Sequence, residues 1–146
     1  MSAQPFSHPS PDLSALGAGF ADGSRGSQAV FRAAMDALSH PGRPLDMPVE
    51  TGVPRQGHIA SAALLLGLLD ADTSVWISPS LRHSDAASWL RFHTGCQCVD
   101  DVGAAQFVWL ALGDELPQLS ELRLGNDTYP HQSATCVIEV RGLQAD

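Results

Sequence analysis

The chain has 146 residues, of which 44% are hydrophobic and 16% charged, a composition typical of one globular domain with a buried core. Its net charge of −8 predicts an acidic surface that repels phosphate backbones, which argues against nucleic-acid binding. All eight cationic side chains are arginines. Because there is no lysine, the sequence excludes a lysine Schiff base, a Walker phosphate loop and a protein-kinase site.

Residues 1–26 are rich in proline, glycine and serine and predict a flexible N-terminal arm, followed by a single α/β domain over residues 27–146. No basic stretch leads into an apolar one, so no secretory signal is visible. The longest apolar run, Ile59 to Leu69, is shorter than the roughly 20 residues of a membrane span. Three cysteines, an odd number, fit a reducing compartment. We therefore expect a cytoplasmic protein that does not contact a membrane.

The first half of the domain predicts two helices. One apolar face begins after a possible N-cap at Ser27 and ends at Pro41-Gly42; its members are Val30, Phe31, Ala34, Met35 and Leu38. Residues 44–49 are flanked by prolines and could form an edge strand. Residues 58–69 are apolar almost all round, which predicts a helix buried between layers.

The second half alternates strands and helices. A continuous apolar run predicts a strand over 74–78, and Ser84 and Gly95 bracket a third helix. Residues 97–99 and 105–111 predict two further strands, residues 116–122 one or two helical turns, and residues 134–141 a last strand. This order predicts an α/β fold, a three-layer αβα sandwich with a mixed sheet between helices.

Several segments, in one order and with similar gaps, resemble the PhnH family, one component of the carbon–phosphorus lyase core complex. They are Phe31-Arg32 with Ser39 and Pro41-Gly42, then Leu64-Leu65-Leu66, Asp72-Thr73, Val75-Trp76-Ile77-Ser78, and the most specific, Leu90-Arg91-Phe92-His93-Thr94. The resemblance implies the fold of the large domain of pyridoxal-phosphate-dependent transferases without that cofactor. Members of the family continue past the strand that ends here near Arg141, so the resemblance also implies that the chain is either truncated at its C-terminus or a short variant of the family.

The same resemblance implies a role in organophosphonate catabolism. Family members form a homodimer that assembles with subunits G, I and J of the carbon–phosphorus lyase core complex, helped by a further ATP-binding subunit. The complex replaces the adenine of ATP by an alkylphosphonate and so forms a ribose 1-phosphonate 5-triphosphate. The chemistry lies mainly on other subunits. We therefore expect a non-catalytic or accessory subunit of a multi-subunit transferase and lyase system, inactive alone and with no cofactor or metal of its own.

Three residues are candidates for binding an anion or another subunit. Arg91 and His93 lie in the last turn of the third predicted helix, where guanidinium and imidazole groups could hold a phosphonate or phosphate. Cations at that position also satisfy free carbonyls and the negative end of the helix dipole, and this structural role or a subunit contact is the favoured interpretation. Arg32 lies in a first helical turn, which predicts an ion pair with Asp36 or an interface role.

Two alternatives remain open. The chain could be a stand-alone protein that binds small anions, or a small enzyme in which Arg32 and Arg91 hold a phosphoryl group and His93 acts as an acid or base. Cys96-Gln97-Cys98, together with Cys136 and His93, could indicate a metal or redox site, but the spacing differs from Cys-x-x-Cys. Buried apolar cysteines on one face of a strand are the simpler interpretation.

The tryptophans are predicted to be core or interface anchors. Trp89 and Leu90 are adjacent on a helix, so both cannot lie at the centre of one narrow apolar stripe. We expect one of the two to face a second subunit.

Overall fold

The fold is built on a parallel sheet of four strands in the order β2-β1-β3-β4. It is seen in a computed structural model that describes residues 16–48, 52, 54 and 56–144. The strands are β1 (Ser74–Ile77), β2 (Gln97–Cys98), β3 (Phe107–Leu110) and β4 (Thr135–Ile138). This confirms the α/β class and places four strands where the sequence predicts them. No helix in the described part of the chain is long and apolar enough to cross a bilayer.

All pairings among these strands are parallel, whereas the sequence predicts a mixed sheet. Val75 of β1 lies beside Cys98 on one side and Phe107 on the other, and Trp109 of β3 lies beside Val137 of β4. Parallel neighbours need crossover connections rather than hairpins. Although β2 and β3 are close in the sequence, they do not form a hairpin, because they pair with opposite sides of β1.

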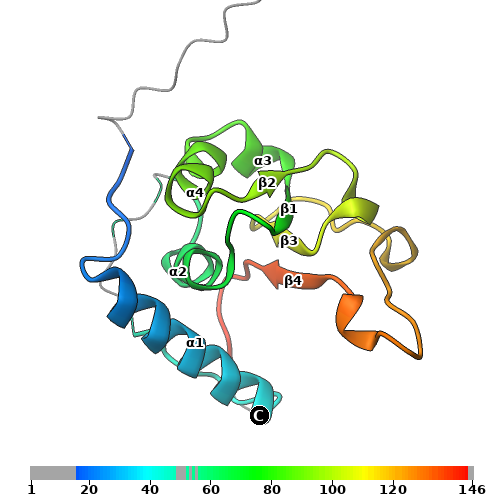
Figure 1. Cartoon of the computed structure of the whole chain (residues 1–146), viewed down its shortest axis with the longest axis horizontal. Helices are drawn as coiled ribbons and strands as arrows, with labels where there is room; N and C mark the ends of the chain where they lie inside the picture. The colour runs from blue at the N-terminus through cyan, green and yellow to red at the C-terminus, as the bar shows by residue number, and fades with distance from the viewer. Residues whose placement is uncertain (1–15, 49–51, 53, 55, 145–146) are drawn as a thin grey trace, which may run out of the picture.

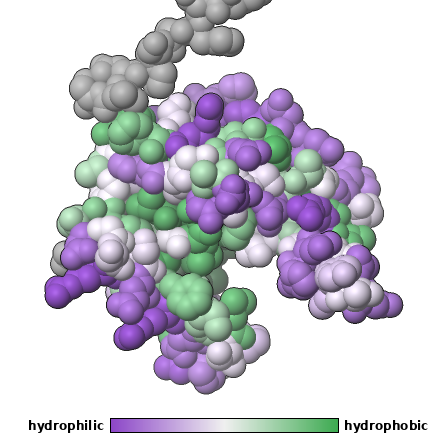
Figure 2. All heavy atoms as spheres, in the orientation of Figure 1, coloured by the Kyte–Doolittle hydropathy of each residue, from purple (hydrophilic) through white to green (hydrophobic). Residues whose placement is uncertain are grey.

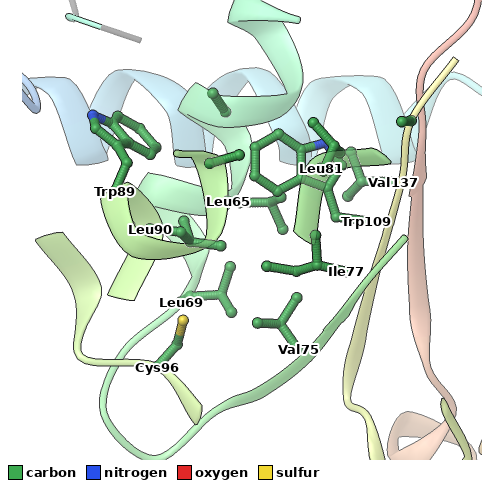
Figure 3. Close-up of a cluster of buried hydrophobic side chains, with 13 residues drawn as sticks. Leu65, Leu69, Val75, Ile77, Leu81, Trp89, Leu90, Cys96, Trp109 and Val137 are labelled. Atoms are coloured by element: carbon green, nitrogen blue, oxygen red, sulfur yellow. The ribbon is translucent and has the colours of Figure 1, made fainter. Parts of the chain in front are cut away.

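Helices α2 (Ile59–Leu68) and α4 (Ala86–Thr94) lie on one side of the sheet, and the connection from β3 to β4 lies on the other side (Figure 1). Strand side chains alternate between faces, so Val75 and Ile77 point to the helical side. There they join a buried cluster that includes Leu65 of α2 and Leu90 of α4 (Figure 3). This cluster is the core of the molecule.

The predicted helical layer on the second face is not found in the part that the structure describes. Residues 111–134 form single 3-10 turns instead: η3 (Leu119–Glu121) lies where one or two helical turns are expected, and η4 (Pro130–Gln132) follows; η2 (Val102–Ala104) precedes β3. Proline and glycine interrupt this connection and prevent a longer helix. Its surface is largely hydrophilic in the view of Figure 2.

Helix α1 (Gly23–Ser39) packs against α2, outside the two main layers (Figure 1). It begins four residues before the predicted N-cap, because the Asp22 side chain accepts a hydrogen bond from the Arg25 amide and caps the helix there. Its first turn therefore lies within the predicted arm 1–26, of which residues 1–15 are outside the described residues. The division into an arm and a domain over 27–146 stays a prediction.

Several other local predictions can be compared with the structure. Helix α2 follows its N-cap His58, and α4 ends at Gly95 in the left-handed conformation with φ 73°, both as expected. Residues 44–48 form no strand, and Val49 lies outside the described residues. The short helix α3 (Pro79–Arg82) is not predicted from the sequence, because Pro79 fits the end of a strand as well as a first helical turn.

Trp89 and Leu90 are both completely buried, so the prediction that one of them faces a second subunit is wrong. Leu90 enters the core between α2 and β1. Trp89 belongs to the same buried cluster and also packs against the His93 ring on α4, with the two ring centroids 5.2 Å apart. Residues 16–20 run past the His93 side of α4 and cover it, a long-range contact that the helical periodicity does not reveal.

Candidate functional site

The carboxyl ends of β1 and β3 lie side by side, and the connections that follow these two strands lead to opposite edges of the sheet. From β1 the chain continues to β2 on one edge, and from β3 it continues to β4 on the other. In open parallel sheets, ligands bind in the crevice at such a point. This edge of the sheet is therefore the first place to look for a site.

Two serines join the loops across this crevice. The Ser78 hydroxyl, fully buried, accepts a hydrogen bond from the Ala111 amide at 2.9 Å, and the Ser78 amide donates to the Trp109 carbonyl. Further out, the Ser80 amide donates to Asp114 Oδ2 at 2.9 Å and its hydroxyl donates to Asp114 Oδ1. The hydroxyls of Ser80 and then Ser78 hold the pKa of Asp114 below its ordinary value.

Two cavities border the Ser80–Asp114 bridge. One, of about 470 Å³, is lined by Ser80, His83 and Ser84 with Gln56 and Asp85. The other, of about 390 Å³, has Trp76 and Leu116 in its wall beside Asp114 and two glutamates. Both are open to solvent and contain no arginine among the residues described, so neither is a ready pocket for a phosphonate.

A buried carboxylate stabilises the same end of the sheet. Glu139, which follows β4, is 6% exposed; its Oε1 accepts hydrogen bonds from the His58 amide at 2.7 Å and the Trp109 indole at 3.0 Å. It thereby fixes the entry into α2 against β3. Glu139 is not among the residues predicted from the sequence, although its position two residues after Val137 places it on the buried side of the strand.

The three candidate anion-binding residues lie in separate surroundings. Arg32 lines a groove of about 490 Å³ beside α1, together with Arg25 and two carboxylates. The predicted Arg32–Asp36 pair is not formed; Asp36 pairs with His40 Nδ1 at 3.1 Å instead. Of these three cavities in the described part of the chain, only the groove beside α1 is lined by one of the candidate residues, Arg32.

Arg91 and His93 point to different sides of α4. The His93 Nε2 atom lies 2.9 Å from the Gly17 carbonyl, so the ring fastens the N-terminal segment. Arg91 is exposed and acts electrostatically on the thiols of Cys96 and Cys98. Residues two apart on a helix are about 200° apart around its axis, which explains why the two side chains do not share a pocket. Their anion-binding role stays a prediction.

The cysteines also separate into two groups. Cys96 is buried and Cys98, contrary to the expectation of a buried pair, is exposed; the two thiols are close enough that each affects the pKa of the other. Cys136 lies on β4, two strands away from β1. Among the described residues, no three histidine, cysteine or acidic side chains gather as a metal site would require.

Comparison with known proteins identifies a family and a curated relative. The model of the bacterial phosphonate metabolism protein family PhnH matches residues 18–146. The alpha-D-ribose 1-methylphosphonate 5-triphosphate synthase subunit PhnH of Rhizobium meliloti (strain 1021) is 37% identical over 125 residues, which are 86% of this chain and 62% of the relative. Because the family model spans nearly the whole described fold, this chain belongs to the PhnH family of bacterial phosphonate metabolism proteins.

Proposed function

We propose that this chain is an accessory subunit of a phosphonate-degrading synthase, of the kind named for its Rhizobium relative. The observation behind the proposal is the family match over residues 18–146 together with 37% identity to a subunit of alpha-D-ribose 1-methylphosphonate 5-triphosphate synthase. The chain spans 62% of the length of that relative. The reaction proposed for the assembled complex joins an alkylphosphonate to the ribose of ATP in place of adenine.

The arrangement of the candidate residues favours an accessory role over that of a small enzyme. Arg32 lines a groove on α1, His93 binds the backbone of Gly17, and Arg91 lies beside a thiol pair. A phosphoryl-transfer site needs such groups to converge on one bound anion. We also propose the fold of the large domain of pyridoxal-phosphate-dependent transferases, in which this chain has no lysine to bind that cofactor.

We further propose that the chain forms a homodimer and assembles with subunits G, I and J. Large apolar side chains of β4 and of the loop after β3 are exposed to solvent; they are Ile138 on the strand and Leu112 and Leu116 on the loop, each more than two-fifths exposed. Large apolar side chains exposed on neighbouring segments are typical of protein–protein contacts. The edge strand β4 extends this surface with unpaired backbone groups within the described sheet. We assign this surface to another member of the complex.

Co-expression with subunits G, I and J tests the proposal. We expect the tagged chain to purify with all three, and to restore growth on methylphosphonate as the only phosphorus source to bacteria that lack their own PhnH protein. The full-length Rhizobium relative is the positive control. Failure of the chain both to associate and to restore growth, under conditions in which the relative does both, would contradict the proposal.

Two charge substitutions test which surface is used. Ile138→Arg places a cation on the exposed surface of β4, and Leu38→Arg places one on α1, where Leu38 is 76% exposed. We expect Ile138→Arg to reduce co-purification with the partner subunits and Leu38→Arg to leave it unchanged. The reverse result would indicate that the partner subunits contact α1 instead of the sheet.

A further inference from the structure

Two cysteine thiols lie side by side where α4 passes into β2. Cys96 follows the left-handed residue Gly95 and is 4% exposed, and its sulfur points toward Leu69 in the core (Figure 3). Cys98 lies in β2 and is exposed. Residues two apart on an extended segment share a face, which brings the two thiols close enough for each to affect the pKa of the other.

The surroundings of the pair are electropositive. Arg91 in the last turn of α4 acts on both thiols, and Arg82 of α3 acts on Cys98. Arg82 is itself paired with Asp100 at 2.9 Å, whereas Arg91 makes no ion pair within the described residues. The Thr94 hydroxyl donates to the Leu90 carbonyl at 2.7 Å and accepts a hydrogen bond from the Cys96 amide at 3.1 Å, which fixes the backbone beside the thiol. Positive charge and hydrogen-bond donors stabilise a thiolate, which is the reactive form of cysteine.

These groups change how the pair titrates. The Cys98 thiol, as hydrogen-bond donor, lowers the pKa of Cys96 to about 7, and Thr94 and Arg91 act in the same direction while burial opposes them. The pKa of Cys98 is raised, first because its proton is held by the neighbouring sulfur and then because of burial. The pair therefore loses one proton near neutral pH and keeps the other.

The third cysteine provides an internal comparison. Cys136 lies on β4 opposite Val108, on a different strand pair from Cys96 and Cys98. Burial raises the pKa of its thiol. An isolated thiol of this kind is neutral at pH 7 and reacts slowly.

We propose that Cys96 and Cys98 form a redox-active dithiol that low-molecular-weight disulfides oxidise to an intramolecular disulfide. The proton of the exposed Cys98 thiol first passes to the Cys96 thiolate, and the Cys98 sulfur then attacks the small disulfide and releases one small thiolate. The Cys96 sulfur then attacks the Cys98 sulfur of the mixed disulfide and releases the second thiolate. Two protein thiols are oxidised, one small disulfide is reduced, and the two protons of the dithiol end on the two small thiols.

The position of the pair makes this disulfide reversible and gives it a structural effect. At about 3.3 Å per residue, α-carbons two residues apart in a strand are about 6.6 Å apart, near the upper limit for a disulfide. The backbone of β2 must therefore contract when the bond forms. β2 is held to β1 by hydrogen bonds from the amides of Gln97 and Val99, at 2.9 and 3.0 Å. Oxidation should loosen this edge of the sheet, and the strained bond should be easily reduced.

Oxidised glutathione is the probe for the first test. The reduced full chain is incubated with it at pH 7.5, digested with trypsin and analysed by mass spectrometry; cleavage after Arg91 and Arg123 leaves Cys96 and Cys98 on one peptide and Cys136 on another. We expect the peptide of residues 92–123 to lose two hydrogens and carry no glutathione. Cys136→Ser should give the same result, and Cys96→Ser should leave a stable mixed disulfide on Cys98.

The rate of alkylation by iodoacetamide is the second test, and it separates a reactive pair from three ordinary thiols. At pH 7 we expect the pair to react about 10-fold or more faster than Cys136, because about half of it is ionised against about 1% of a thiol with a pKa near 9. Arg91→Gln should shift the pH profile of the pair upward, and circular dichroism checks that the variant is folded. Equal rates for all three cysteines, or glutathione added without an intramolecular bond, would overturn the proposal.

Discussion

At the scale of single residues, the least expected feature is the buried acid Glu139. One carboxylate oxygen accepts hydrogen bonds from two groups far apart in the sequence, the His58 amide and the Trp109 indole. The indole of Trp89, equally buried, finds no acceptor within the described residues. Of these two buried tryptophans, Trp109 therefore donates its indole N–H to a carboxylate, whereas the indole N–H of Trp89 has no acceptor within the described residues.

Glu139→Ala is expected to lower the free energy of unfolding by about 2–4 kcal/mol, because the buried Trp109 indole loses its acceptor at a cost of about 1–3 kcal/mol and the part-buried His58 amide loses it at about 1 kcal/mol. Glu139→Gln keeps an acceptor oxygen and should cost less. Urea unfolding followed by tryptophan fluorescence measures both. Glu115→Ala, at an exposed position, is the matched control and should stay within about 0.5 kcal/mol of the unchanged chain. Equal losses for Glu139→Ala and Glu115→Ala would contradict this role of Glu139.

Asp114 should make stability depend on pH. Hydrogen bonds from Ser80 and Ser78 lower its pKa in the folded chain, so the carboxylate is stabilising above the ordinary aspartate pKa of about 3.9. That contribution is lost as the pH falls through the lower folded pKa. We expect Asp114→Asn to reduce the free energy of unfolding at pH 7 and the difference to shrink below about pH 4, measured by urea unfolding from pH 7 to 3. Asp127→Asn, in an exposed loop, should show no such trend.

At the scale of elements, close approach decides how the helices pack. A methyl group built on Gly67 of α2 would lie 2.8 Å from Cγ1 of Val30, the one fully buried residue of α1. The two helices touch here because one of them has no side chain. Gly23, also in a helix, has open space around it.

Gly67→Ala is therefore expected to destabilise the chain by about 1–3 kcal/mol through overpacking, although alanine in a helix is otherwise favoured over glycine by about 1 kcal/mol. The double variant Gly67→Ala with Val30→Ala should recover part of the loss, since it removes the clashing methyl groups. Thermal unfolding of the single and double variants measures the coupling. Gly23→Ala is the control and should be neutral or stabilising. A coupling of zero would mean that the two residues do not meet.

At the scale of the whole molecule, the fold has a strongly packed centre and a weakly held outer helix. Strands β1 and β3 lie inside the sheet and against the core, whereas α1 buries only Val30 and exposes Phe31, Met35 and Leu38. Apolar side chains reach the surface between α1 and the sheet in Figure 2. Stability should therefore be distributed unevenly over the chain.

Hydrogen exchange read by mass spectrometry tests this distribution. We expect amides of β1 and β3 to exchange at the rate of global unfolding, and those of α1 to exchange at least about 10-fold faster through local opening. In the assembled complex, protection should increase on β4 and the loop after β3. Protection of α1 equal to that of β3 in the isolated chain would contradict the prediction.

Much of the local structure follows from the sequence. The apolar run at 74–78, the helix at 58–69 and the stop at Gly95 depend on neighbouring residues only, because helix and strand periodicity, caps and left-handed glycine are local effects. The segments that resemble the PhnH family identified it correctly. α3 was missed because one proline fits both the end of a strand and the first turn of a helix.

The sequence by itself determined the α/β class, the positions of most elements, the family and the absence of lysine chemistry. Only the tertiary structure decided that the four strands are parallel, that Glu139 joins His58 to Trp109, and that Arg91 belongs with the Cys96–Cys98 pair while His93 fastens the N-terminal segment. The physical reason is that strand order and side-chain partners depend on contacts between residues distant in the sequence, which local periodicity does not specify.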